Sequence, residues 1–129
     1  MYTGFIYKIV ADGTDKVYYG STINSLNKRM DSHIYYFKTG RKCSSREMFD
    51  YPNTQIELLE THYNVDKKEL QQILFEVEAG YINRFRKYRP GRCVNEKIPY
   101  KSLAEYHQEI KEIKERLRLR QKDLSSNNN

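Results

Sequence analysis

Residues 4–22 read GFIYKIVADGTDKVYYGST, and this stretch decides how the rest of the chain is interpreted. Two β-like runs, FIYKIV and KVYYGS, flank the turn-forming cluster ADGTD, which predicts a hairpin with strands over 3–10 and 16–20. Side chains alternate between the faces of a strand, so Tyr7 and Tyr18 share one side of the hairpin if the register permits it. Such tyrosines are either core residues, as expected in a chain with 12 Tyr, or phenols held together for chemistry.

Helix signals follow the hairpin. Ser25 is a good N-cap for a helix that runs to Lys38 and is stopped by Gly40. Ser44 and Glu47 have the spacing of a capping box, which predicts a second, short helix.

A third strand and a long helix complete the predicted core. The segment TQIELLE, residues 54–60, is typical of a strand, and Asp66 opens a helix that ends near Tyr88, before Pro90. The expected buried face of that helix consists of Leu70, Leu74, Val77, Tyr81 and Phe85. Together these elements predict an α/β (α+β) fold, a small three-stranded antiparallel sheet flanked by helices.

A further helix is expected at the C-terminus, starting at Ser102. Its basic, amphipathic pattern covers 101–124, and the polar residues 125–129 are expected to form a disordered tail. The apolar repeat consists of Leu103, Tyr106, Ile110, Ile113 and Leu117. This helix is expected to dock on the core, to pair with a second chain as a homodimer, or to lie along DNA.

Composition favours a polyanionic partner inside the cell. The net charge is +6 over 129 residues, with a pI of about 9.2. Cys43 and Cys93 show no CxxC spacing, which argues against a disulfide framework or a thiolate metal site. No apolar run approaches the roughly 20 residues that span a bilayer, and no signal-peptide pattern is seen. An intracellular location, cytoplasm or nucleus, is expected, without membrane contact.

Basic residues gather in three runs, FKTGRKCSSR, RFRKYRPGR and KERLRLRQK. Any one run is explained by a solvated surface, whereas three runs with few acids favour nucleic-acid binding. The residues predicted to contact nucleic acid are Lys38, Arg41, Lys42, Arg84, Arg86, Lys87, Arg89 and Arg92.

Glu78 is the acidic residue least suited to its predicted position. At about 100° per residue, it lies roughly 60° from the centre of the apolar face, whereas Glu76 lies roughly 140° away. A carboxylate at the core margin needs a partner such as a metal ion or a strong donor. The alternative is a boundary residue in a salt bridge.

Arg29 and His33, four residues apart, share one flank of their helix. They are interpreted either as a guanidinium that binds phosphate beside an imidazole that carries protons, or as a surface arginine beside a boundary histidine.

The order of these residues resembles that of the GIY-YIG endonucleases. FIYKIV and VYYGST resemble the paired signature, and SLNKRMDSH resembles the family's Arg-x-x-x-His helix. EAGYI resembles its later glutamate motif and CVNEKIP its closing asparagine, so the resemblance covers about residues 4–98 and predicts a nuclease domain over 1–100. Phe5 and Tyr19 depart from it, standing where the motifs have Gly and Ile.

The resemblance implies metal-dependent hydrolysis of DNA phosphodiester bonds that leaves 5′-phosphate ends. Glu78 would hold Mg²⁺, with Mn²⁺ as a substitute. Tyr7 would act as general base or within a relay, although a free phenol has a pKa of about 10. Arg29 would neutralise charge on the phosphate.

The resemblance gives the remaining motif residues supporting roles. His33 and Tyr18 would position groups or shuttle protons, and Asn95 would orient its neighbours. Gly20, the end of the second signature, is grouped with the nucleic-acid contacts. Two other classes stay open, a catalytically inactive nucleic-acid-binding module of the same fold and a structural protein built around the C-terminal helix.

Overall fold

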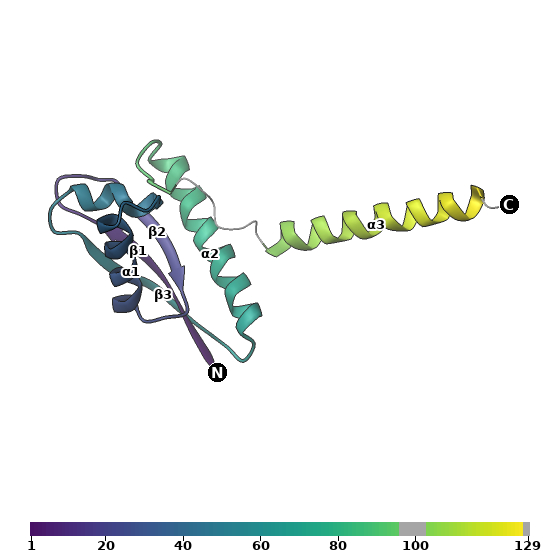
Figure 1. Ribbon diagram of the computed structural model, residues 1–129, viewed down its shortest axis with the longest axis horizontal. Coiled ribbons are helices and arrows are strands. Elements are labelled where there is room, and N and C mark those ends of the chain that lie inside the picture. Colours follow the sequence, from purple (N-terminus) through teal and green to yellow (C-terminus); the bar gives the residue numbers. More distant parts are fainter. Residues whose placement is uncertain (96–102, 128–129) are drawn as a thin grey trace.

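The computed structural model describes residues 1–95 and 103–127 (Figure 1). The elements are β1 (Tyr2–Val10), β2 (Tyr18–Thr22), α1 (Leu26–Lys38), the 3-10 helix η1 (Ser44–Asp50), β3 (Gln55–Asn64), α2 (Lys67–Tyr88) and α3 (Leu103–Asn127). The strands form one antiparallel sheet in the order β2-β1-β3. The expected α+β fold, a three-stranded sheet with flanking helices and an added C-terminal helix, is confirmed.

The sheet separates two layers of core. On one face Ile6 packs against Leu70 and Leu74 of α2. On the other face Tyr7 and Ile9 pack against Met48 of η1, with residues of α1 beside them. All six of these side chains are buried, so α2 covers one face of the sheet and α1 with η1 covers the other.

The register of the hairpin places the two tyrosines on the same face. Tyr7 pairs with Gly20 and Ile9 pairs with Tyr18, so Tyr7 and Tyr18 are diagonal neighbours. The second strand, β2, begins at Tyr18 rather than at the predicted residue 16. Val17, just before it, forms a bridge with Cys93 instead of pairing with β1.

Both N-caps of the long helices follow the sequence signals. The Ser25 side chain accepts a hydrogen bond from the Lys28 backbone, and the Asp66 side chain accepts two, from Lys68 and Glu69. The positive φ of Gly40, 72°, places it in the left-handed region just after α1, where glycine is favoured.

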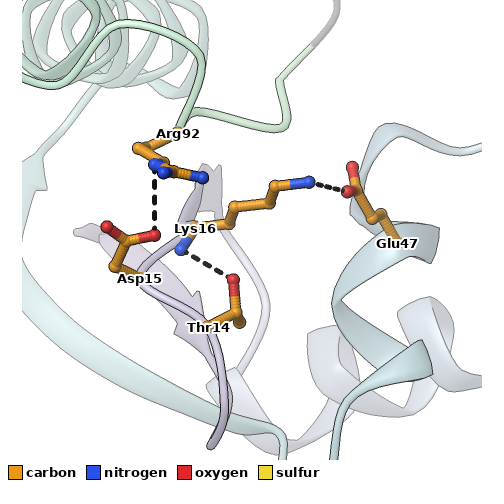
Figure 2. Close-up of polar contacts among 5 residues, drawn as sticks. All are labelled: Thr14, Asp15, Lys16, Glu47 and Arg92. Carbon is orange, nitrogen blue, oxygen red and sulfur yellow. Dashed lines mark hydrogen bonds and ion pairs between the residues drawn. The ribbon is translucent and has the colours of Figure 1, made fainter.

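The capping box at Ser44 and Glu47 was a wrong prediction. The N-cap of η1 is Cys43, and its side chain makes no capping hydrogen bond. Glu47 instead pairs with the ammonium group of Lys16, on the turn that follows β1 (Figure 2). A tertiary ion pair has therefore replaced the local cap.

The buried face of α2 is rotated relative to the prediction. Its buried residues are Leu70, Leu74, Glu78, Ala79 and Ile82, whereas Val77, Tyr81 and Phe85 are half-buried at its margins. Leu70, Leu74, Glu78 and Ile82 form one i, i+4 row. Glu78 thus lies in the buried row itself.

The C-terminal helix α3 extends away from the sheet and α2 (Figure 1). Its described side chains, at 108 and 111–122, are all exposed, so docking along the core is not observed. The helix continues to Asn127 and includes part of the expected disordered tail. Ser102, the boundary at residue 100, and the side chains of Leu103, Tyr106 and Ile110 lie outside the described residues. Among the helices described, none is long and apolar enough to cross a membrane.

Candidate functional site

Four of the predicted catalytic side chains meet between the sheet and α1. The Tyr7 hydroxyl of β1 lies 2.7 Å from Nε2 of His33 and accepts a hydrogen bond from Nε of Arg29 at 3.0 Å. Arg29 and His33 lie one turn apart on α1, which is why one phenol can reach both. The Tyr18 ring lies edge-on to the His33 ring, with centroids 5.3 Å apart.

Gly20 provides the space for this arrangement. A Cβ at Gly20 would collide with Cζ and Oη of Tyr7, which lies directly across the hairpin. Gly20 is buried and its φ is not positive, so space, rather than backbone conformation, requires a glycine here. Its assignment to the nucleic-acid contacts stays a prediction; in this structure Gly20 lies against the ring of Tyr7.

Burial keeps the tyrosines and the histidine of the site uncharged. Desolvation raises the pKa of Tyr7 to about 12, although the guanidinium of Arg29 opposes the shift. Burial also raises the pKa of Tyr18. Burial, reinforced by the positive charge of Arg29, lowers the pKa of His33 to about 3. At neutral pH, Arg29 is thus the charged member of this group of four.

Glu78 approaches the group from α2. Its side chain is 6% exposed, and burial raises its pKa to about 8, opposed by Arg29 and by a hydrogen bond from the Ser21 backbone. The described residues contain no cluster of three His, Cys, Asp or Glu that could hold a metal ion. Glu78 is thus the carboxylate that would bind a metal at this position, without a cluster of three such ligands among the described residues. That donor suits Mg²⁺, which binds few protein ligands and keeps several waters, and the cation would favour the ionised carboxylate.

A cleft of about 230 Å³ opens beside these residues. Arg29, which bonds to Tyr7, lines the cleft. Ser21, whose backbone bonds to Glu78, lines it too, so the Tyr7 group and Glu78 both adjoin this cleft. The other lining residues are Thr22, Ile23, Gln71, Leu74 and Phe75.

Asn95 lies apart from the Tyr7 group. Its side-chain oxygen accepts a hydrogen bond from the Tyr19 backbone N–H at 2.9 Å, and its amide nitrogen donates to the Tyr19 carbonyl at 2.7 Å. Tyr19 faces α2, where its ring stacks on Tyr81. Asn95 therefore holds β2 in place, in keeping with an orienting role.

The predicted nucleic-acid contacts occupy two surface regions, one after α1 and one at the end of α2. All eight basic side chains except Arg86 are exposed. Arg86 is half-buried and donates to the carbonyl of Asn95, and Arg92 pairs with Asp15 at 3.3 Å (Figure 2). These two arginines thus also have structural partners. Arg41 lies over the rings of Tyr35 and Tyr36, 5.7 Å and 5.8 Å from their centroids.

Sequence reasoning missed two residues next to His33. The hydroxyl of Ser45, on η1, lies 2.6 Å from Nδ1 of His33, and the side chain is fully buried. Cys43 contacts Ser45 in turn, with its sulfur 3.1 Å from the Ser45 hydroxyl oxygen. Cys43 was considered only as a possible disulfide or metal ligand and Ser45 not at all, because no local pattern in the sequence marks either as a partner of His33.

Comparison with known proteins agrees with this geometry. The family model of the GIY-YIG catalytic domain matches residues 3–92. No curated protein and no solved structure matches the chain. The matched residues include all of β2, α1 and α2 and β1 from Thr3 onward, and thus Tyr7, Tyr18, Arg29, His33 and Glu78. GIY-YIG domains are nuclease domains that act on nucleic acid, and this chain belongs to the GIY-YIG catalytic domain family.

Proposed function

We propose that the chain is a Mg²⁺-dependent DNA endonuclease that hydrolyses phosphodiester bonds and leaves 5′-phosphate ends. The observation that carries this proposal is the hydrogen-bonded group of Arg29, Tyr7 and His33 beside a cleft that also adjoins Glu78. The group offers a phosphate-binding cation, a proton relay and a metal-binding carboxylate, three components that together suit metal-dependent phosphodiester hydrolysis.

Arg29 is the expected phosphate ligand. Its Nε is held by Tyr7, and its guanidinium lines the cleft, so its terminal nitrogens can donate to a phosphate bound there. Because the planar group is fixed at one end, little side-chain entropy is lost when it binds. Arg29 then stabilises the negative charge that develops on the phosphate oxygens.

Tyr7 is expected to act as a relay rather than as a phenolate. With a pKa of about 12 it holds its proton at neutral pH. It can accept a proton from the attacking water while its own proton moves to Nε2 of His33, 2.7 Å away. Burial and then the positive charge of Arg29 disfavour protonated His33 in the free protein, and a bound phosphate anion would offset the contribution of Arg29.

Glu78 would hold the metal ion through its carboxylate. When bound, Mg²⁺ supplies Lewis acidity at the phosphate oxygens. The ring of Tyr18 packs on the rings of Tyr7 and His33. Tyr18 would therefore position the relay and shield it from bulk solvent.

Incubation of the purified chain with supercoiled plasmid tests the proposal directly. Nicked or linear product should form with Mg²⁺ or Mn²⁺ and not with EDTA. Ligation of the nicks without prior kinase treatment would show 5′-phosphate and 3′-hydroxyl ends. Binding without cleavage under any metal condition would instead support the inactive binding module.

DNA binding is expected to depend steeply on salt. If the exposed basic residues contact about six phosphates, affinity should fall roughly 10³-fold between 50 and 200 mM salt. Arg84→Gln and Lys87→Gln should each reduce the slope of log K against log salt by about 1. Lys8→Gln is the matched control, since Lys8 pairs with Glu57 on β3, and it should leave the slope unchanged. Affinity that is flat over this range would remove the basic surface from the proposal.

Removal of residues 101–129 should weaken DNA binding or assembly while some plasmid nicking remains. The residues assigned to chemistry all precede this segment, and the described side chains of α3 are exposed. Size measurement by light scattering on both chains would show whether α3 pairs two copies. A folded truncation without activity at any enzyme concentration would contradict this expectation.

A further inference from the structure

Ser45 lies within a chain of hydrogen bonds that begins at Arg29 and ends at Cys43. Arg29 bonds to Tyr7, Tyr7 to Nε2 of His33, Nδ1 of His33 to Ser45, and Ser45 to Cys43. The separations along this chain are 3.0, 2.7, 2.6 and 3.1 Å. Tyr7, His33 and Ser45 are each no more than 1% exposed, so the links between them are shielded from bulk solvent.

The donors and acceptors of this chain fit together in one direction. Nε of Arg29 can only donate, so the Tyr7 oxygen accepts from it. The phenol is protonated at neutral pH, and its other hydrogen-bond partner is Nε2 of His33, so the phenol donates to that nitrogen. A neutral imidazole carries one proton, which must then lie on Nδ1 and be donated to Ser45.

Cys43 provides the acceptor at the other end of this chain of hydrogen bonds. The Ser45 oxygen receives the proton of Nδ1, so the Ser45 hydroxyl is free to donate to the sulfur of Cys43. That sulfur also lies 3.9 Å from Nδ1, a longer separation than the one to Ser45. Each donor along this chain, from Nε of Arg29 to the Ser45 hydroxyl, thus has an acceptor, and no buried side-chain polar atom among the described residues lacks a partner.

We propose that Ser45 is a positioning residue that holds His33 as the Nδ1–H tautomer, so that Nε2 stays available to receive the Tyr7 proton. This inference rests on the proposed function for its catalytic consequence but not for the tautomer itself. In the other tautomer, Nε2 would donate to Tyr7, and the phenol would face two donors with no acceptor for its own proton. The relay from water through Tyr7 would then be blocked.

The experiment compares Ser45→Ala with the parent and with Ser32→Ala. Nitrogen-15 NMR of the full-length chain with labelled histidine reports which ring nitrogen of His33 carries the proton. The parent should show the Nδ1–H form. Ser45→Ala should show a mixture of tautomers and lower metal-dependent nicking by about 10²-fold, the low end of what positioned proton transfer contributes.

Two further variants separate positioning from packing. Ser45→Thr keeps the hydroxyl and should restore the tautomer and much of the activity. Ser32 lies next to His33 on α1 but bonds to the Lys28 carbonyl, so Ser32→Ala should change neither readout.

The outcomes distinguish this inference from the proposed function. An Nε2–H tautomer in the parent overturns the inference, and that measurement needs no folded variant. An unchanged tautomer and unchanged nicking in Ser45→Ala overturn it as well. A parent that cleaves no DNA but loses its Nδ1–H tautomer in Ser45→Ala refutes the proposed function and leaves the positioning role standing.

Discussion

Glu78→Gln should reduce plasmid cleavage by several orders of magnitude while DNA binding is retained or becomes tighter. The substitution keeps the size and much of the hydrogen bonding of the side chain but removes the charge that would hold Mg²⁺. Binding without metal is spared because the carboxyl of Glu78, with a pKa of about 8, is mostly uncharged at neutral pH, and binding becomes tighter only where that carboxyl is ionised. Nicking assays over a range of Mg²⁺ and gel-shift assays without metal measure the two effects separately.

Glu76→Gln is the matched control on the same helix. Glu76 lies two residues away and is not part of the buried row, so its variant should cut nearly as well as the parent. If Glu76→Gln is inactive and Glu78→Gln is active, the metal-binding role has been assigned to the wrong carboxylate. Full activity in both variants would refute the metal-dependent nuclease and favour the binding module.

The same variant should also make the protein more stable at alkaline pH. The folded pKa of Glu78, about 8, is raised above its ordinary value of 4.5, so the unfolded chain loses this proton at a lower pH than the folded chain. Stability is therefore lost as pH rises from 4.5 to about 8, and Gln avoids that loss. The difference in melting temperature between Glu78→Gln and the parent, measured without metal, should widen across this window. A constant difference would contradict the raised pKa.

Gly20→Ala should reduce cleavage by more than about 10²-fold, the effect expected of misplacing a reacting group by about 1 Å. The added methyl would overlap Cζ and Oη of Tyr7. Tyr7 is fully buried, so its ring can yield only by moving its hydroxyl away from Arg29 and His33. The overlap should also cost about 1–3 kcal/mol of stability, as overpacking generally does.

Gly80→Ala is the control for this prediction. Gly80 is exposed on α2, a Cβ there meets nothing within 4 Å, and its φ is not positive. Alanine should therefore stabilise the helix by up to about 1 kcal/mol and leave cleavage unchanged. Melting curves of Gly20→Ala and Gly80→Ala, and nicking rates measured below the melting temperatures of both variants, check this prediction. Normal activity in folded Gly20→Ala would show that the position of the Tyr7 hydroxyl does not limit the reaction.

The sequence predicted those parts of the fold that short-range chemistry controls. The hairpin, the N-caps at Ser25 and Asp66 and the end of α1 near Gly40 each depend on a few neighbouring residues. The side of α2 that is buried depends on tertiary packing against Ile6 and Tyr19, which periodicity does not contain. For this reason Glu78 was expected at the margin and was found in the buried row.

Contacts between distant segments account for what was missed at the site. Ser44 and Glu47 fit a local capping pattern, but the Lys16 ammonium attracts Glu47 across 31 residues of sequence. Ser45 is a common residue in an unremarkable run, and only the fold brings its hydroxyl to His33. The motif predicted that Tyr7, Arg29 and His33 act together, and the structure supplies the buried support that no motif records.

Residues 92–95 cover the outer edge of the sheet at β2, which affects whether copies of this protein can associate through that edge. The Val17 backbone N–H donates to the Arg92 carbonyl, the Val94 N–H donates to the Val17 carbonyl, and the Asn95 side chain occupies both backbone groups of Tyr19. This short segment therefore serves β2 as a substitute neighbouring strand at the edge of the sheet. An edge covered in this way gives no template for strand addition, so intermolecular sheet growth and aggregation are blocked at the strand that carries Tyr18 and Gly20.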